Sequence, residues 1–294
     1  MLETLLSLAK RFQNMDRRFV FLGMALAIVG PLIWPINLSF EVNKEVVALY
    51  EQVEQLEPGD PVLVSTDFDP ASKPELGPFF TANLHHMFRN DLRPVFVTLW
   101  VTSIPLVLPE IEAVAESYGK EYGKDWAFLG YKPGGDLVIK AIGQNITSMF
   151  NKDHYGTDVE DIAVMQGLRQ AKDFPLLVSV SAGNPGIENY VLQIQAQYNL
   201  NIVGACTAVS GPDTIPFFKS SQLTGLSMGM PGSAQYETMV WDTVTDRYDG
   251  QPPEGMKRMA TAAMGVLNFG HLFIIVLILL GNLAYFFTRI MGEK

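Results

Sequence analysis

Residues 176–207 read LLVSVSAGNPGIENYVLQIQAQYNLNIVGACT, and this stretch decides the fold. Residues 176–181 and 202–207 are short, largely apolar runs, which are typical of strands buried on both faces of a sheet. Residues 186–198 between them have the pattern of a helix. A strand, a helix and a second strand in this order predict two parallel strands joined by a right-handed crossover.

The same alternation extends in both directions from this unit. Further strands are expected at residues 62–66, 95–100, 126–130 and 223–227, and helices at residues 41–56, 75–91, 106–121, 136–150, 159–171 and 233–248. Strands that alternate with helices favour a parallel sheet with helices on both of its faces. We therefore predict an α/β fold, a Rossmann-like three-layer domain whose mostly parallel sheet has five or six strands.

Two apolar runs, residues 19–40 and residues 266–287, flank this domain. Each has 22 residues, and roughly 20 apolar residues are needed to cross a bilayer as a helix. We predict a transmembrane helix at each end, the second belonging to a longer helix over residues 254–288. A cleavable signal peptide is the alternative for the first run, but no small-residue cleavage site follows it.

The basic residues that flank the two runs predict their orientation. Lys10, Arg11, Arg17 and Arg18 precede the first run, whereas Arg289 and Lys294 follow the second. Because positive charge marks the cytoplasmic side, both termini are expected in the cytoplasm and residues 41–253 outside it. Residues 1–18 are predicted to form an amphipathic helix on the inner membrane surface or against a partner, and residues 289–294 a short cytoplasmic tail.

The charge and cysteine content narrow the class of protein. Residues 41–253 contain 27 acidic and 13 basic side chains, a net charge of −14, which disfavours binding to nucleic acid. Cys206 is the only cysteine, so an intrachain disulfide and a cysteine-based metal site are excluded. An extracytoplasmic domain without disulfides favours the inner membrane of a prokaryote over an animal cell surface.

Candidate ligand-binding residues lie where the predicted strands end, because open parallel sheets bind ligands at the carboxyl ends of their strands. These residues are Asp67, Asp69, Thr102, Tyr131, Ser181, Gly183, Asn184, Ser210 and Ser233. The loop of residues 181–186 leads from a strand into a helix, so its N–H groups could hold an anion. Glu188 would repel that anion, and a tight strand-to-helix turn is the alternative interpretation.

No complete catalytic set or metal site is predicted, and no cofactor is expected. Asp67 and Asp69 could form a carboxylate pair, but no third ligand stands nearby in the sequence. The alternative is that Asp69 caps the turn before Pro70. Ser233 is expected to cap the helix over residues 233–248, with Glu237 in its first turn.

The long helix over residues 254–288 contains small and polar residues that predict contacts with other helices. These residues are Ala260, Ala263, Gly270, His271, Gly281 and Asn282. Small residues allow helices to approach closely in lipid, and an intramembrane Asn or His usually marks a helix contact or a function.

Three functions remain open on the sequence alone. The leading hypothesis is a non-enzymatic membrane protein, embedded in the bilayer, that builds a homo-oligomer or joins a partner membrane protein. The second is an extracytoplasmic small-molecule sensor that acts through a membrane partner. The third is a membrane-anchored, hydrolase-like enzyme that uses Asp67 and Asp69.

Overall fold

The computed structural model describes residues 2–34, 41–247 and 256–291 and divides the chain into two compact units. One is an α/β unit over Phe40–Thr261, and the other is a helical unit formed by Met1–Ser39 and Ala262–Lys294. Each unit is described by itself below.

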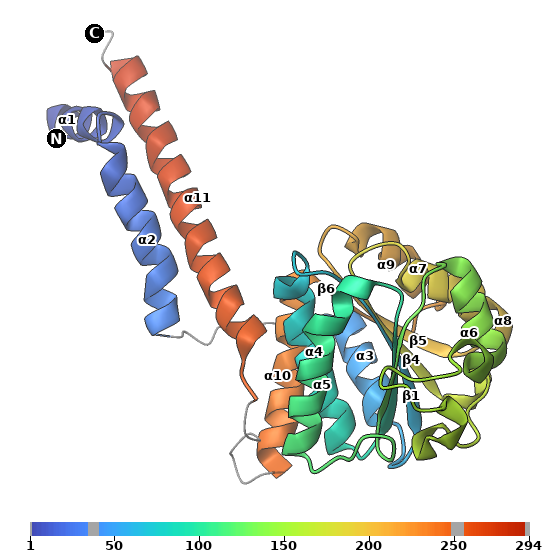
Figure 1. Ribbon diagram of the computed structural model, residues 1–294. Coiled ribbons are helices and arrows are strands. Elements are labelled where there is room, and N and C mark those ends of the chain that lie inside the picture. The colour runs from blue at the N-terminus through green and yellow to red at the C-terminus, as the bar shows by residue number, and fades with distance from the viewer. Residues whose placement is uncertain (1, 35–40, 248–255, 292–294) are drawn as a thin grey trace. The chain divides into compact units, whose positions relative to one another are not determined.

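The α/β unit contains a six-stranded parallel sheet, as predicted (Figure 1). Its strands are β1 (Pro61–Asp67), β2 (Arg93–Thr98), β3 (Ala127–Tyr131), β4 (Leu176–Ser181), β5 (Asn201–Cys206) and β6 (Gly225–Met228). They are arranged in the order β3-β2-β1-β4-β5-β6, and every pairing between neighbours is parallel. This is the strand order of a doubly wound Rossmann-like sheet. All strands run parallel, but the order in which the chain adds them reverses between β1 and β4.

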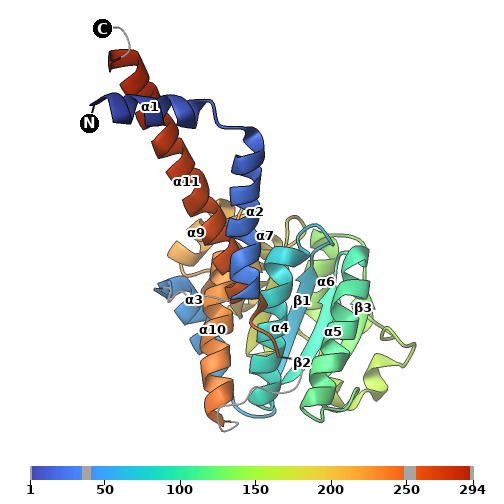
Figure 2. The same cartoon turned by 90° about the vertical axis from the view of Figure 1, so that its left-hand side faces the viewer.

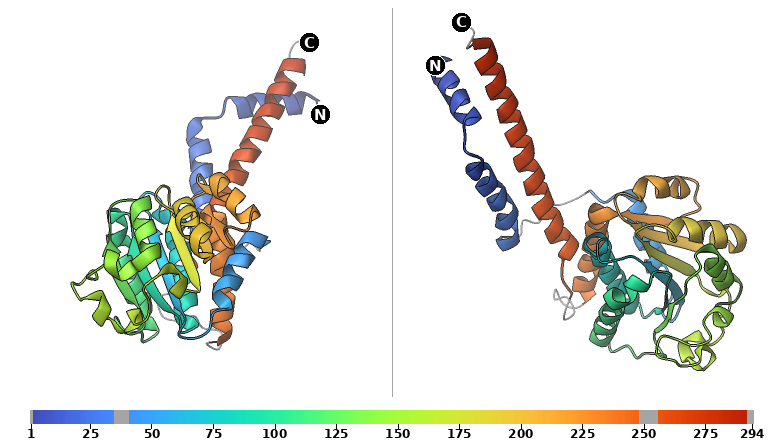
Figure 3. Two further views of the ribbon diagram at one scale, coloured as in Figure 1. Left: turned by 90° about the vertical axis from the view of Figure 1, so that its right-hand side faces the viewer. Right: turned by 45° about the horizontal axis from the view of Figure 1, so that its top comes forward.

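Helices cover both faces of this sheet, as the left-hand view of Figure 3 shows. One face packs against α3 (Lys44–Glu54), α4 (Lys73–Arg89), α5 (Ile104–Ser117) and α10 (Gly229–Arg247). The other packs against α6 (Asp136–Met149), α7 (Ile187–Tyr190), the π-helical turn η5 (Val191–Gln195), α8 (Ala196–Tyr198) and α9 (Gly211–Lys219). Val62 and Val64 of β1 face the first layer, whereas Leu63 faces the second, so the strand is apolar on both sides.

The predicted helix at residues 159–171 is wrong. The chain there forms three separate 3₁₀ turns, η2 (Val159–Asp161), η3 (Ala163–Met165) and η4 (Ala171–Asp173). The Val164 amide donates to the Gly123 carbonyl oxygen at 2.9 Å, so this amide does not form the hydrogen bond that a helix would require. Gly167 has a φ of +85°, which no continuous right-handed helix contains.

The helical unit contains α1 (Leu2–Gln13), α2 (Arg17–Ile33) and the part of α11 (Met259–Met291) that follows Thr261. Asp16 accepts a hydrogen bond from the Arg18 amide at 2.9 Å, which caps α2 and separates it from α1. Phe273 of α11 packs against Gly23 of α2, where a Cβ atom would lie 2.5 Å from the ring. α1 lies across the second half of α11 (Figure 2), where Gln13 donates to Thr288 at 3.0 Å.

Among the described residues, one helix is long and apolar enough to cross a membrane, and it spans Met259–Arg289. This supports the predicted C-terminal membrane helix, although helix begins at Met259 rather than near residue 254. α2 has 17 residues, a length of about 26 Å, against a bilayer core of about 30 Å. The rest of the first run, residues 35–40, lies outside the described residues, so the N-terminal membrane helix stays a prediction.

Candidate functional site

The sheet reverses its winding between β1 and β4, the position at which Rossmann-like sheets usually bind ligands. Asp67 ends β1 and Ser181 ends β4, and the two residues are partners in the parallel register. The predicted strand-end residues Asp67 and Ser181 are therefore neighbours, although they are separated by more than 100 positions in the sequence.

Asp67 is inaccessible to a ligand, because its side chain is fully buried. Its Oδ2 atom accepts a hydrogen bond from Ser65 Oγ at 2.5 Å, and its Oδ1 atom accepts one from the Leu99 amide at 2.6 Å. Burial raises the pKa of Asp67 to about 7, although both hydrogen bonds oppose that rise. The carboxyl group thus ties β1 to the segment that follows β2.

Asp69 does not share a site with Asp67. Its carboxylate accepts hydrogen bonds from the amide and the hydroxyl of Ser72, which close the turn before α4. These bonds lower the pKa of Asp69, as is usual for a carboxylate that caps a turn. Within the described residues, no three His, Cys, Asp or Glu side chains are grouped so that they could hold a metal ion.

The loop of residues 181–186 is held by hydrogen bonds within it and to the segments around it. Ser181 Oγ donates to the Gly183 carbonyl oxygen at 2.8 Å, and the Gly186 amide donates to Asn189 Oδ1 at 2.9 Å. A Cβ atom at Gly186 would lie 1.8 Å from Ser181 Oγ, so only glycine fits there. The Trp100 indole donates to the Pro185 carbonyl oxygen at 3.1 Å, which anchors the loop to the end of β2. These contacts are those of a tight strand-to-helix turn.

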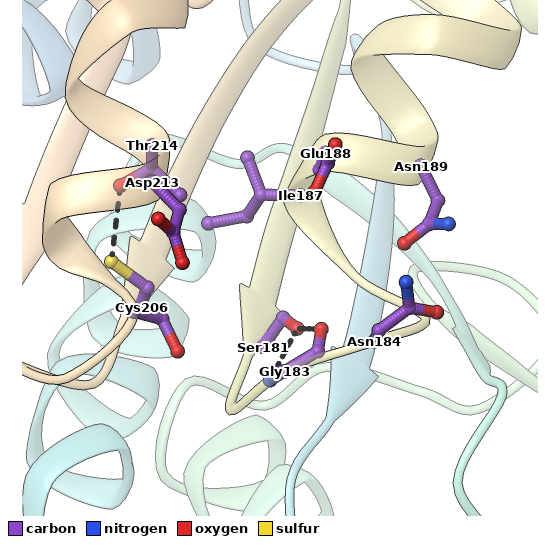
Figure 4. Close-up of a pocket in the computed structure, with 10 residues that line it drawn as sticks. Ser181, Gly183, Asn184, Ile187, Glu188, Asn189, Cys206, Asp213 and Thr214 are labelled. Atoms are coloured by element: carbon purple, nitrogen blue, oxygen red, sulfur yellow. Dashed lines mark hydrogen bonds between the residues drawn. The ribbon is translucent and has the colours of Figure 1, made fainter.

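A cavity of about 140 Å³ opens beside this loop, between the ends of β4 and β5 (Figure 4). Four of the predicted strand-end residues line it: Ser181, Gly183, Asn184 and Ser210. Six further lining residues were not predicted: Ile187, Glu188, Asn189, Cys206, Asp213 and Thr214. Most of these residues lie in the first turns of α7 and α9. The glycine-containing segments before those turns were the sequence signal that could have indicated them.

The chemistry of this cavity disfavours anions. Glu188 and Asp213 both line it, and neither forms a salt bridge within the described part of the chain. The Cys206 thiol lies 3.5 Å from Thr214 Oγ1, and burial raises its pKa to about 11, so it is a neutral thiol rather than a nucleophile. With its amide and hydroxyl groups, the cavity suits a small cation or a small neutral polar molecule better than a phosphate.

The other predicted site residues lie away from this cavity. Thr102 is exposed in the 3₁₀ turn η1 (Val101–Ser103), and Tyr131 ends the edge strand β3. Ser233 does not cap a helix, because α10 begins at Gly229, and its hydroxyl donates to the Glu75 carbonyl oxygen at 2.7 Å. The structure therefore brings some of the predicted residues together and gives Asp67, Asp69 and Ser233 structural contacts.

A chain of polar groups, buried except at Glu54, connects α3, α4 and α10. Asn83 donates to the Tyr236 hydroxyl at 2.9 Å, Tyr236 lies 2.7 Å from His86 Nδ1, and His86 Nε2 lies 2.8 Å from Glu54. Burial lowers the pKa of His86 to about 4, so the ring is neutral and donates its Nε2 proton to the Glu54 carboxylate. Tyr236 and His86 are fully buried, so we interpret the chain of groups as a structural connection between helices rather than a catalytic triad.

Two side chains of α10 hold the segments where the α/β unit begins and ends. Gln235 accepts from the Asn43 amide and donates to the Glu41 carbonyl oxygen, both at 3.2 Å. Glu237 accepts from the Ala260 amide at 3.1 Å and from the amide and hydroxyl of Thr261 at 2.7 Å each. The predicted place of Glu237 in the first turn of its own helix is wrong, because α10 begins two turns earlier, at Gly229, and Glu237 caps the start of α11.

The fold and the site define a Rossmann-like α/β domain joined to a helix that can span a membrane. No family model matches the sequence, and a comparison with curated proteins gave no match. Among solved structures, a trehalose-6-phosphate synthase (OtsA) is similar with a TM-score of 0.29 and 11% sequence identity. The similarity covers 81% of this chain and 47% of that chain, and at this TM-score it supports no conclusion about function.

Proposed function

We propose that this chain is a non-enzymatic membrane protein that builds an oligomeric or partner-bound assembly in the inner membrane of a prokaryote. Its two apolar runs cross the bilayer, its termini lie in the cytoplasm, and its acidic α/β domain lies outside. The observation that carries this proposal is Asn282, an exposed amide in the middle of apolar sequence on α11.

An amide that faces lipid lacks the hydrogen bonds it makes in water, so a polar group on a neighbouring helix stabilises it. Within the described residues, the α1 and α2 helices offer Asn282 no hydrogen-bond partner. Thr288 on the same helix differs, because it bonds to Gln13 and to the carbonyl oxygens of Ala284 and Tyr285. The partner of Asn282 therefore belongs to another chain.

The α/β domain supports the same proposal. Its strand-end loop is closed by its own hydrogen bonds, and Asp67 is buried, which disfavours a catalytic role for that edge of the sheet.

The test is the mass of the protein extracted in mild detergent, measured by light scattering. We expect a particle of several 32.6 kDa chains, or of this chain with a partner. Asn282→Leu should reduce that mass, because it removes an interhelical hydrogen bond of roughly 1 kcal/mol per copy. Leu279→Ala, a change at an exposed apolar position of the same helix, serves as the control and should leave the mass unchanged. A wild-type protein that is a monomer would refute the proposal.

Ligand sensing is the second candidate function, and the cavity beside residues 181–186 favours it. Its two carboxylates and its small volume suit a compact amine. Ethanolamine should raise the unfolding temperature of the full chain, because a ligand that binds only the folded state stabilises it. Asp213→Asn should abolish that rise, and glycerol serves as the uncharged comparison. Equal effects in the wild type and the variant would exclude this site.

A further inference from the structure

We propose that two copies of this chain pair in parallel through one face of α11, with Asn282 of each copy bonded to Asn282 of the other. This inference rests on the proposed function and names the partner as a second copy. The face consists of His271, Ile275, Ile278, Asn282, Tyr285 and Arg289, and we call it the heptad face.

The heptad face has the spacing of a coiled-coil seam. Its residues are separated alternately by four and three positions, which is the repeat that brings two helices into continuous contact. At 100° per residue they lie within an arc of about 80° on the helix surface. All six are exposed, and Ile275, Ile278 and Tyr285 are each more than half exposed, at 53%, 55% and 55%.

The opposite face of α11 is already occupied within the chain. Phe273 packs on Gly23 of α2, and Thr288 accepts from Gln13 of α1. Leu280, Leu283, Ala284 and Phe287 line a small cavity together with Leu8, Ala9 and Phe12 of α1. These α11 positions lie roughly 120–260° around the helix from His271, so the contacts of the described residues of the helical unit leave the heptad face uncovered.

Polarity distinguishes the heptad face from the rest of the exposed surface of α11. The neighbouring exposed residues Leu272, Val276 and Leu279 are aliphatic, as lipid requires. His271 and Asn282 stand 11 positions apart, three helical turns, and point in nearly the same direction. Two polar groups that share one face of a lipid-exposed helix indicate a helix partner along that face.

A second copy is the occupant that the chemistry favours. An asparagine amide carries both a donor and an acceptor, so two of them can bond reciprocally across a two-fold axis. Parallel copies place Asn282 at the same depth in the bilayer, whereas a different protein would need a polar group at that depth. A single Asn at such a position also sets the register of paired helices. Ile275 and Ile278 then supply the apolar contact next to it.

Disulfide cross-linking of the full chain in its membrane tests this pairing. Ile278→Cys, oxidised with copper phenanthroline, should give a band at twice the chain mass on a non-reducing gel. Val276→Cys is the matched control, because Val276 is 42% exposed and points about 140° away from His271. The wild-type protein gives the background level of cross-linking, since its single cysteine, Cys206, is buried. Adding Asn282→Leu to Ile278→Cys should reduce the dimer several-fold.

Equal cross-linking at positions 276 and 278, or none at position 278, would overturn the pairing. An adduct of another mass would also overturn it, because the partner would then be a different protein. The detergent mass measurement separates this failure from that of the proposed function. A multimeric particle without a cross-link at position 278 refutes only the heptad face, whereas a monomer refutes both.

Discussion

Replacing Glu237 with leucine is expected to release the start of α11 from α10 and to destabilise the α/β unit by about 2–4 kcal/mol. The carboxylate accepts three hydrogen bonds from Ala260 and Thr261, and its side chain is only 2% exposed. Leucine leaves those donors unpaired in a buried place, and each unpaired buried donor costs roughly 1–3 kcal/mol. Part of this cost is avoided because water can enter once the segment moves away.

Amide hydrogen exchange across residues 256–264 and urea unfolding of the full chain in detergent measure the two effects. Exchange in the Glu237→Leu variant should be faster there than in the wild type, and the unfolding midpoint should fall. Glu237→Gln keeps one acceptor oxygen and is the matched control, with an intermediate effect on both. Unchanged exchange at residues 256–264 in the leucine variant would show that Glu237 does not hold the helix.

Replacing Asp67 with asparagine is expected to remove much of the pH dependence of the stability of the α/β unit. Burial raises the pKa of Asp67 from 3.8 to about 7, so the folded protein holds this proton more tightly than the unfolded chain. The wild type should therefore lose stability as the pH rises between about 4 and 7 and change little above that. The loss between pH 5 and pH 8 is roughly 2–3 kcal/mol, at 1.36 kcal/mol per pKa unit. Asparagine does not ionise, and its oxygen can still accept from the Leu99 amide.

Urea unfolding at pH 5 and pH 8, followed by tryptophan fluorescence, compares the two proteins. Between pH 5 and pH 8 the asparagine variant should lose roughly 2–3 kcal/mol less stability than the wild type. Asp69→Asn is the control, because the pKa of Asp69 is lowered and its titration lies below this range. The same pH dependence in the wild type and the Asp67→Asn variant would contradict a raised pKa of this buried carboxyl group.

The sequence predicted the sheet well, because its signal is local. Each strand is a short apolar run, and β4 begins and ends at the predicted residues Leu176 and Ser181. The helix over residues 159–171 was predicted wrongly because its apolar spacing resembles that of a helix. Contacts with a distant loop, such as the bond between Val164 and Gly123, prevent helix formation there.

The candidate site was predicted only in part. Strand ends converge by a general rule of parallel sheets, so Ser181, Asn184 and Ser210 could be proposed from the sequence, and they line one cavity. The sequence could not show that Asp67 points into the protein, because its burial depends on Leu99 and Ser65. Asp213 was missed because α9 brings it to the cavity from beyond β5.

The sequence by itself determined the alternation of strands and helices, the parallel sheet and the apolar C-terminal helix. These follow from hydrophobic patterns within about 20 neighbouring residues, which act before any tertiary contact forms. Only the tertiary structure decided the strand order, the raised pKa of Asp67 and the capping of α11 by Glu237. Glu237 and Thr261 are 24 positions apart, and Asp67 and Leu99 are 32 apart. Hydrogen bonds over such separations depend on how whole elements pack, because no local pattern specifies which buried donor a carboxylate will meet.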